Sequence, residues 1–275
     1  MFKDLSGSLL LIGGGKMGAS LFTGWVQSGL NPKKVIIIEP NKHFAGELES
    51  KGALVFSSPD KIPNGFIPKV AILAVKPQVV SSIIGLYQEF VSNEFLLISI
   101  AAGVTIESLK KGIGNVPIIR AMPNTPAAIG SGITAAHANK NVTDSQRSIC
   151  NNILGAVGEV VWIADESKMN AITAVSGSGP AYVFLLIECL SAAGVSAGLD
   201  PELSLRLAKE TVAGSGELAK LSHNDPSILR ENVTSPGGTT AAALEVLMQD
   251  NNGLESLINQ AVRAAAERSR ELSEE

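Results

Sequence analysis

The chain is poor in the residues that usually build metal sites and disulfide frameworks. Its 275 residues include two cysteines and three histidines. Cys150 and Cys189 have neither the paired spacing of a zinc site nor the density of a disulfide-stapled secreted domain, so we expect both to be buried thiols in a reducing cytosol. His43, His137 and His223 have no partner at metal-ligand spacing. We expect surface or capping roles for them and no bound metal.

An excess of positive charge is also absent. The chain has 22 basic and 26 acidic side chains, a net charge of -4, and no basic stripe that could follow a phosphate backbone. Nucleic acid is therefore not expected as a partner. Residues 1–4 lack the layout of a signal peptide, which favours a cytoplasmic protein. The apolar content of 45% is enough for a sizeable core in one large domain or two modest ones.

One long apolar segment, at residues 181–199, has the length of a membrane span. It contains Glu188 and Cys189 and many small residues, and it begins just after Pro180, which suits the first turn of a helix. We interpret it as a buried helix of a soluble protein and expect no membrane partner. A helix that is apolar all round must be covered on every side, and this part of the chain is too small to supply that cover alone. A partner chain is the expected source.

A short buried strand at the start of the chain runs into the glycine-rich segment 13–18 and then into a helical pattern. This is the context of a dinucleotide-binding fingerprint, with Gly13 for the tight turn, Gly15 for close approach of pyrophosphate and Gly18 for packing of helix on strand. Glu39 follows the next strand, 21 residues after Gly18, where a ribose-binding acid is expected. The pattern predicts a nicotinamide or flavin dinucleotide. The cofactor-binding residues predicted here are Ile12, Gly13, Gly15, Lys16, Met17, Gly18 and Glu39.

Hydrophobic periodicity divides the chain into two parts. Short apolar runs alternate with helical stretches in the first part, which predicts a Rossmann-type α/β domain over residues 1–164 with a mostly parallel sheet and helices on both faces. Residues 165–275 lose the strand signal and form the predicted helical domain for substrate binding and dimerisation. The predicted strands are 9–12, 35–38, 70–75, 95–100, 117–120 and 159–163. The predicted helices of the second part are 166–175, 181–199, 201–221, 227–232, 239–249 and 254–272.

Ligands bind at the carboxyl ends of the strands in an open parallel sheet, so the residues that follow each strand are candidates. Lys76 either contacts cofactor phosphate or ribose, or is a solvated loop lysine. The small Ala101 and Ala102 either admit a nicotinamide ring or simply pack closely. Asn124 either bonds a carboxamide or stiffens its own loop. The cofactor-binding candidates at these strand ends are Ala74, Val75, Lys76, Pro77, Ala101, Ala102 and Asn124.

A second anion-binding signal lies at residues 235–240, with the sequence Ser-Pro-Gly-Gly-Thr-Thr, where an apolar helix begins. The first amides of a helix lack internal partners and carry the positive end of its dipole. A small carboxylate or phosphate can therefore bind there without any Lys or Arg. The alternative is an ordinary Ser or Thr cap.

These motifs together resemble the pyrroline-5-carboxylate reductases. The fingerprint ending at Gly18, Ala-Val-Lys-Pro at 74–77, Asn-Thr-Pro at 124–126, Ser-Gly-Ser-Gly-Pro at 176–180 and the segment 235–240 occur in the order found in that family. The resemblance covers nearly the whole chain. It implies reduction of 1-pyrroline-5-carboxylate to proline by NADPH or NADH, the last step of proline synthesis. It also implies a homodimer or larger ring built from interleaved helical domains.

Site roles follow from the resemblance and from the chemistry of a cyclic imine. Such an imine is readily protonated near neutral pH, so positioning and one hydroxyl can suffice without a strong acid. Thr240 is expected to bond the imine nitrogen as the catalytic residue. The resemblance implies that Ala101, Ala102 and Asn124 line the nicotinamide. The other expected substrate-binding residues are Ser178 and Gly179, which help to close the pocket, and Ser235, Gly237, Gly238 and Thr239, which bind the carboxylate.

Three other functions fit less well. Ser178 lies in Gly-Ser-Gly and not in the Gly-x-Ser-x-Gly elbow of serine hydrolases. A hydroxyacid dehydrogenase would place a catalytic Lys on the helix at 181–199, which has none. A non-catalytic dinucleotide sensor would not need the segment 235–240.

The choice between the two nicotinamide cofactors is a separate question. Glu39 favours NADH over NADPH, whereas the family commonly accepts NADPH, and Asn41 and Lys42 could offset the repulsion between Glu39 and the 2'-phosphate. The preferred cofactor, the subunit count, feedback by proline and any discrete proton donor stay open.

Overall fold

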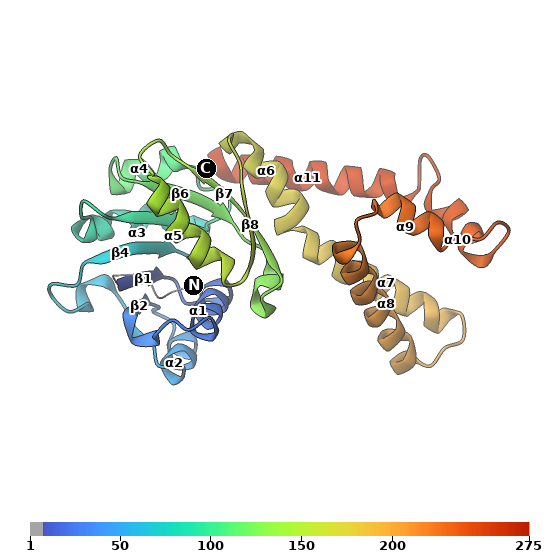
Figure 1. Cartoon of the computed structure of the whole chain (residues 1–275), viewed down its shortest axis with the longest axis horizontal. Coiled ribbons are helices and arrows are strands. Elements are labelled where there is room, and N and C mark those ends of the chain that lie inside the picture. Colours follow the sequence, from blue (N-terminus) through green and yellow to red (C-terminus); the bar gives the residue numbers. More distant parts are fainter. Residues whose placement is uncertain (1–7, 275) are drawn as a thin grey trace. The chain divides into compact units, whose positions relative to one another are not determined.

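The computed structural model describes residues 8–274, and within them one eight-stranded sheet with the order β3-β2-β1-β4-β5-β6-β7-β8 (Figure 1). Every neighbouring pair is parallel except β6 and β7. The predicted α/β fold with a mostly parallel sheet is confirmed. The expectation about a signal peptide concerns residues 1–4, which lie outside the described part. The strands are β1 (Ser8–Ile12), β2 (Val35–Ile38), β3 (Leu54–Phe56), β4 (Pro68–Leu73), β5 (Leu96–Ser99), β6 (Ile118–Met122), β7 (Gly132–Ala138) and β8 (Gly158–Trp162).

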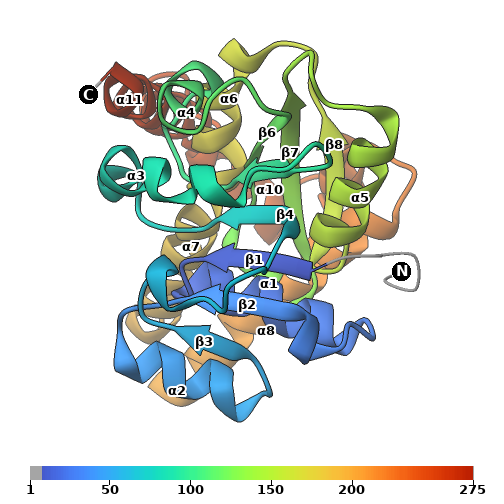
Figure 2. The same ribbon diagram turned by 90° about the vertical axis from the view of Figure 1, so that its left-hand side faces the viewer.

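The central strands read as continuous apolar runs because both faces of the sheet are covered by helices (Figure 2). In β1, Leu9 and Leu11 point into the core under α1 and α5, while Leu10 and Ile12 point into the core under α3 and α4. All four are fully or almost fully buried. Helices on both faces fix these strands. The carboxyl ends of β1, β4 and β5 lie together at one end of the sheet, where the predicted cofactor residues lie.

The helices follow the predicted pattern closely. The α-helices are α1 (Lys16–Gln27), α2 (Lys42–Ser50), α3 (Pro77–Ile83), α4 (Ile106–Ile113), α5 (Asp144–Gly155), α6 (Met169–Ile172), α7 (Gly179–Ser196), α8 (Pro201–Leu221), α9 (Pro226–Asn232), α10 (Thr239–Leu247) and α11 (Leu254–Glu274). The short 3-10 helices are η1 (Pro32–Lys34), η2 (Pro59–Lys61), η3 (Ile84–Phe90), η4 (Thr125–Ile129) and η5 (Glu166–Lys168), and η6 (Thr173–Gly177) is a π-helix. The single helix predicted at 166–175 is thus three short segments of different helical type.

Two strands are missing from the prediction. β3 has three residues, and Leu54 at its start is exposed at the edge of the sheet. β7 has the sequence Gly-Ile-Thr-Ala-Ala-His-Ala, whose small side chains give little strand signal. β7 is nonetheless paired on both sides, antiparallel to β6 and parallel to β8.

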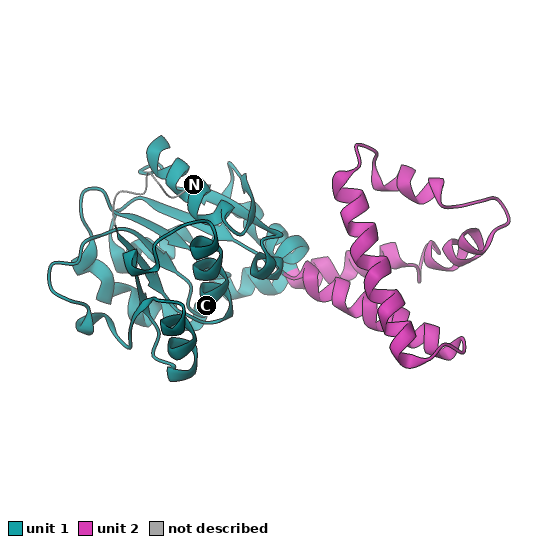
Figure 3. Ribbon diagram, turned by 60° about the horizontal axis from the view of Figure 1, so that its bottom comes forward, with its two compact units in different colours: residues 1–177, 266–275 teal, residues 178–265 magenta. Residues whose placement is uncertain are grey.

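The described chain forms two compact units (Figure 3). Unit 1 comprises the residues up to Gly177 together with those from Ala266 onward, and unit 2 comprises Ser178–Ala265. The last turns of α11 therefore pack on the sheet-containing unit, which the change of pattern after residue 164 did not indicate. The division at residue 164 stays a prediction about domains.

Unit 2 contains α7, α8, α9, α10 and most of α11. α7 and α8 pack closely, because Gly194 leaves room for Ser204, whose hydroxyl donates to the Ser191 carbonyl at 2.7 Å. Within the single chain, however, α7 has no buried residue. The expectation that Cys189 is buried is therefore wrong for the isolated chain: Cys189 is exposed, whereas Cys150 is buried as expected. The cause is that α8 covers only one side of an apolar helix.

Candidate functional site

The glycine segment after β1 forms a tight turn with little free space on two of its three fingerprint positions. Gly13 has a φ of +101°, and a Cβ there would lie 2.7 Å from the Ala74 carbonyl oxygen. A Cβ on Gly18 would lie 2.1 Å from the Gly13 carbonyl oxygen. A Cβ on Gly15 would meet no atom within 4 Å, so this position faces open space. The geometry matches the predicted roles of turn, helix packing and ligand approach.

The start of α1 is arranged to receive an anion. Its N-cap is Gly15, no side chain caps it, and no acidic residue lies in its first turn. Among the described residues, no side chain therefore caps the first amides of α1, and the helix dipole adds positive potential. Lys16 is exposed in the first turn, and Met17 is half-buried against the core. These groups fit the pyrophosphate of a dinucleotide.

Glu39, at the end of β2, is tied to the glycine segment. Its side chain is 8% exposed and accepts hydrogen bonds from the Gly14 amide and the Asn41 amide, each at 2.8 Å. The carboxylate therefore fixes the glycine turn, a role that the sequence did not indicate. Each oxygen keeps a second lone pair, so the predicted bond to a ribose hydroxyl is still available and stays a prediction.

The carboxyl ends of β4 and β5 lie at the same end of the sheet as the glycine turn. Ile12 and Ala74 are joined by a hydrogen bond of 2.7 Å from the Ala74 amide, and the Val75 side chain lies against Gly13. Lys76 is exposed directly before Pro77, which opens α3. The position fits either of the two roles predicted for Lys76, contact with cofactor or solvation.

The two alanines after β5 differ in their surroundings. Ala101 is 4% exposed and packs in the core beneath α3 and α4, with its amide 3.4 Å from the Ser99 hydroxyl. Ala102 is half-buried. Close packing therefore explains Ala101 in the free chain, while Ala102 keeps surface that a flat ring could contact. Their contact with nicotinamide stays a prediction.

Asn124 bonds its own loop, one of the two roles that the sequence allowed. Its side-chain oxygen accepts a hydrogen bond of 2.9 Å from the Ile133 amide at the start of β7. This bond fixes the turn that carries η4. The amide nitrogen of Asn124 donates no hydrogen bond among the described residues, so the predicted contact with a carboxamide is still open.

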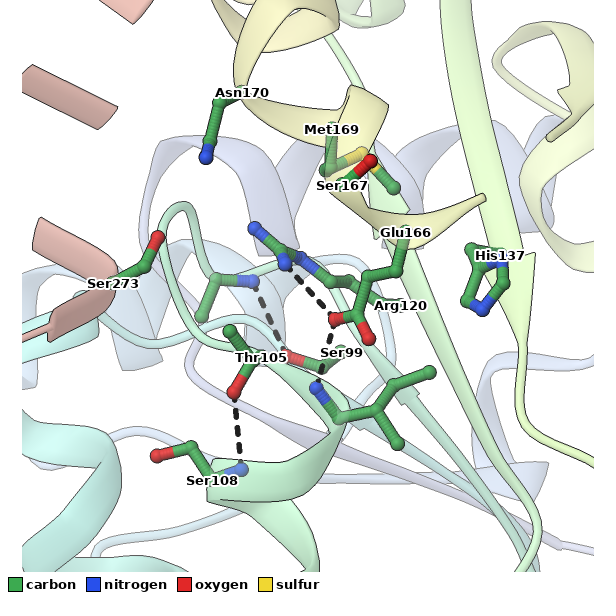
Figure 4. Close-up of polar contacts among 12 residues, drawn as sticks. Ser99, Thr105, Ser108, Arg120, His137, Glu166, Ser167, Met169, Asn170 and Ser273 are labelled. Atoms are coloured by element: carbon green, nitrogen blue, oxygen red, sulfur yellow. Dashed lines mark hydrogen bonds and ion pairs between the residues drawn. The ribbon is translucent and has the colours of Figure 1, made fainter. Parts of the chain in front are cut away.

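An ion pair between a buried arginine and a partly buried glutamate escaped the sequence analysis (Figure 4). Arg120 in β6 is 4% exposed, and its Nη1 lies 2.9 Å from Glu166 Oε1. The same oxygen accepts the Ile106 amide of α4 at 2.9 Å. The two charged residues are 46 positions apart, and no local pattern connects them. The one available signal was Arg120 itself, a charged residue inside a predicted strand for which the sequence offered no role.

Three other titratable groups of unit 1 have local partners or surroundings that account for them. The Ser167 hydroxyl and amide donate to Asp165, and these bonds hold the pKa of Asp165 below its ordinary value. Burial raises the pKa of the Cys150 thiol to about 12, which makes it unreactive. His137, in β7, is half-buried, with Nδ1 3.1 Å from the Ile163 carbonyl oxygen just after β8, so it does not cap a helix. Among residues 8–274, no cluster of three or more His, Cys, Asp or Glu could hold a metal ion.

In unit 2, residues 235–240 place a helix start at the surface. Gly237 has a φ of +68°, and the Gly238 amide bonds the Ser235 carbonyl at 3.0 Å, which closes the turn. Gly238 is the N-cap of α10, and no side chain caps the helix. The segment is therefore not an ordinary Ser or Thr cap. Thr239 is exposed and Thr240 is half-buried in the first turn, beside amides free to bind a carboxylate.

Ser178 and Gly179 lie where α7 begins. Ser178 is the N-cap, and its carbonyl accepts the Ala181 amide at 2.9 Å. Both residues are half-buried, and a Cβ on Gly179 would meet no atom within 4 Å. They therefore have the room that a pocket-closing role requires, and that role stays a prediction.

Comparison with known proteins identifies the family. The model "Pyrroline-5-carboxylate reductase dimerisation" matches residues 166–272, and "NADP oxidoreductase coenzyme F420-dependent" matches residues 8–103. A pyrroline-5-carboxylate reductase of Synechocystis is 42% identical over 98% of this chain and 99% of its own. One from Pisum sativum is 38% identical over 97% and 96%. This chain belongs to the pyrroline-5-carboxylate reductase family.

Solved structures of pyrroline-5-carboxylate reductases agree in fold over nearly all of the chain. The enzyme of Coxiella burnetii superposes with a TM-score of 0.88 at 34% identity, covering 98% of this chain and 99% of that one. The Plasmodium falciparum enzyme, solved with NADP bound, gives a TM-score of 0.85 at 32% identity, with 98% of each chain covered. A prephenate dehydrogenase of Aquifex aeolicus, at 18% identity and a TM-score of 0.55, shares the fold alone.

The dimerisation region of this reductase family member includes its most apolar helical segment. The helical stretch Glu166–Ser196 contains an 18-residue window with a mean hydropathy of 1.5, long and apolar enough to cross a membrane, and the single chain buries none of that window. One such segment is weak evidence for a membrane span. The family model that covers these residues describes dimerisation, which accounts for an apolar helix left uncovered by its own chain.

Proposed function

We propose that this chain reduces 1-pyrroline-5-carboxylate to L-proline with NADPH or NADH. The observation that carries the proposal is the full-length match to pyrroline-5-carboxylate reductases, together with two separate anion-binding helix starts. The first, at α1, suits a dinucleotide, and the second, at α10, suits a small carboxylate. A hydroxyacid dehydrogenase is disfavoured, because α7 contains no lysine.

The residues of unit 1 fit the cofactor. Gly15 leaves open space beside the uncapped start of α1, and Glu39 holds the turn in place. When bound, the reduced nicotinamide supplies the hydride that becomes the new C–H bond at the imine carbon. The α1 amides would hold the pyrophosphate and Glu39 would hold the ribose, and Ala102 and Asn124 would contact the ring. Because these contacts are spread along the cofactor, they fix its position, and no charged catalytic group is needed.

The residues of unit 2 bind and orient the substrate. The α10 amides and the groups of Ser235, Gly237, Gly238 and Thr239 hold its carboxylate. The Thr240 hydroxyl accepts a hydrogen bond from the protonated imine N–H⁺, which keeps its proton, or donates a hydrogen bond to the neutral nitrogen. Hydride addition to the carbon leaves a secondary amine, so the nitrogen must carry a proton by the end of the reaction. A protonated imine already holds that proton, and the chain then needs only to orient it.

Assembly and location complete the proposal. We infer a homodimer or higher homo-oligomer through the helical unit, supported by the dimerisation match and by the uncovered apolar surface of α7. A cytoplasmic location is supported by the low cysteine content and by the absence of any feature that suggests a secreted disulfide framework.

The decisive measurement follows the absorbance of reduced nicotinamide in the presence of 1-pyrroline-5-carboxylate. The wild type should oxidise NADPH or NADH, and Thr240→Ala should lower kcat/KM by roughly ten- to a hundredfold, since a hydrogen bond to a charged group contributes about 1.5–3 kcal/mol. Thr240→Ser keeps the hydroxyl and should retain most of the activity. A wild type that binds the cofactor yet oxidises none with this imine would be a dinucleotide sensor.

A further inference from the structure

One carboxylate oxygen in unit 1 joins the two segments that the proposed function places beside the nicotinamide. Glu166 Oε1 accepts hydrogen bonds from Arg120 Nη1 and from the Ile106 amide, both at 2.9 Å (Figure 4). Arg120 belongs to β6, which leads into the turn with Asn124. Ile106 opens α4, directly after the loop that carries Ala101 and Ala102. Glu166 therefore fixes both strand-end segments from one point.

Net stability does not explain this pair. Arg120 is 4% exposed, and its Nη2 is a buried donor without a hydrogen-bond partner in the described part of the chain. Moving the Arg120 guanidinium out of water offsets much of its attraction to Glu166, whose side chain is 27% exposed, and a buried donor without a partner adds to the cost. An apolar pair of similar volume would be as stable or more so. The feature that an apolar pair could not reproduce is the defined position of the α4 start and of β6.

The same loop is also held by the end of α11. The Ser269 hydroxyl, in a residue only 5% exposed, donates to Asn170 at 2.9 Å, one turn after Glu166. Gly103 has a φ of +77°, and a Cβ there would lie 3.1 Å from the Leu272 Cβ. The loop after β5 is thus packed against α11 on one side and bonded through α4 to Glu166. Few alternative positions remain for it.

We propose that Arg120 and Glu166 are positioning residues that fix the Ala101–Ala102 loop for the nicotinamide ring, with which neither is in contact. The proposal rests on the proposed function, because it takes the ring beside that loop to be nicotinamide. The pair acts on the position of the ring and not on the adenosine half of the cofactor, which lies at the glycine turn and Glu39. Removal of the ion pair should therefore weaken binding of the nicotinamide half of the cofactor and leave binding of the adenosine half unchanged. A general loss of structure would weaken both.

The test uses the double variant Arg120→Met, Glu166→Leu in the full chain. Methionine and leucine fill the space of the two side chains but offer the Ile106 amide no acceptor, so the chain should fold with an unfolding free energy close to that of the wild type while the α4 start loses its anchor. We expect kcat to fall roughly ten- to a hundredfold, as for a small misplacement of reacting groups. Calorimetric titration should show weaker binding of NADPH but unchanged binding of 2',5'-ADP, which lacks the nicotinamide.

Two further variants serve as controls. Glu107→Gln removes an exposed carboxylate in the same first turn of α4, paired with Lys110, and should change neither kcat nor NADPH binding. Arg120→Lys keeps the charge but not the planar guanidinium, and should restore only part of the lost kcat. A double variant with wild-type kcat and NADPH affinity would overturn the proposal, and so would an equal loss of affinity for NADPH and 2',5'-ADP. A wild type inactive on the imine would refute the proposed function, while the two binding measurements would still decide the role of the pair.

Discussion

Glu39 connects the choice of cofactor to the shape of its binding turn. The carboxylate bonds the Gly14 amide on one side and the Asn41 amide on the other, and it is almost completely buried. Asn41 also caps α2, because its side-chain oxygen accepts the His43 amide at 3.0 Å. A short side chain at position 39 would release the turn and weaken binding of both cofactors. A substitution that tests the charge alone must therefore keep the length of the side chain and one hydrogen-bond acceptor.

Glu39→Gln is that substitution. Glutamine keeps one acceptor oxygen, but it lacks the negative charge that repels the 2'-phosphate of NADPH, and it donates where the carboxylate accepted. We expect the ratio of kcat/KM for NADPH to that for NADH to rise by about tenfold, because like charges in contact cost on the order of a kcal/mol or more. Steady-state kinetics with each cofactor measures the ratio. Glu47→Gln, which removes an exposed carboxylate on α2, should leave it unchanged. An unaltered ratio in Glu39→Gln would show that Glu39 does not set the preference.

At the scale of single elements, the turn into α1 separates residues needed for folding from residues needed for ligand approach. Gly18 is in contact with the Gly13 carbonyl, whereas Gly15 faces open space. The same substitution at the two positions should therefore have different results.

Gly18→Ala should lower the unfolding free energy and abolish cofactor binding, because the new methyl group would overlap a backbone oxygen. Gly15→Ala should leave the unfolding free energy within about 1 kcal/mol of the wild type, since the methyl group projects into space that is free in the unliganded protein. It should nevertheless weaken NADPH binding strongly by occupying the path of the pyrophosphate. Denaturant unfolding and calorimetric titration of both variants measure the two effects. Equal unfolding free energies for the two variants would contradict the assigned roles.

The sequence predicted those elements whose evidence is local. β1 and β2 are apolar runs buried on both faces, and α8 spans Pro201–Leu221 as predicted. β3 and β7 were missed, because a three-residue edge strand and a strand of small residues owe their pairing to neighbours already in place. The glycine roles were predictable because each depends on adjacent backbone. The Arg120–Glu166 pair was not, since it depends on how distant segments pack.

At the scale of the whole molecule, unit 2 exposes apolar side chains that its own chain does not cover. Phe184 and Leu185 are 57% and 58% exposed, and further apolar side chains along α7, α8 and α10 are exposed as well. Soluble monomers rarely expose so many adjacent apolar side chains. The match of this region to a dimerisation family indicates a second copy as the cover. Folding and assembly of this unit should then be coupled.

Leu185→Asp tests this coupling, because it places a charge within the apolar surface of α7. We expect the wild type to sediment as a dimer or larger species whose thermal midpoint rises with protein concentration, since association stabilises the folded chain by mass action. The variant should shift toward monomer and lose that dependence, because an unpaired charge is costly to bury at an interface. Ile67→Asp is the matched control, because Ile67 is 65% exposed but lies in unit 1, outside residues 166–272. The sedimenting mass of this variant should equal that of the wild type. A monomeric wild type, or a Leu185→Asp variant of unchanged mass, would show that α7 is not the interface, and its apolar surface would need another partner.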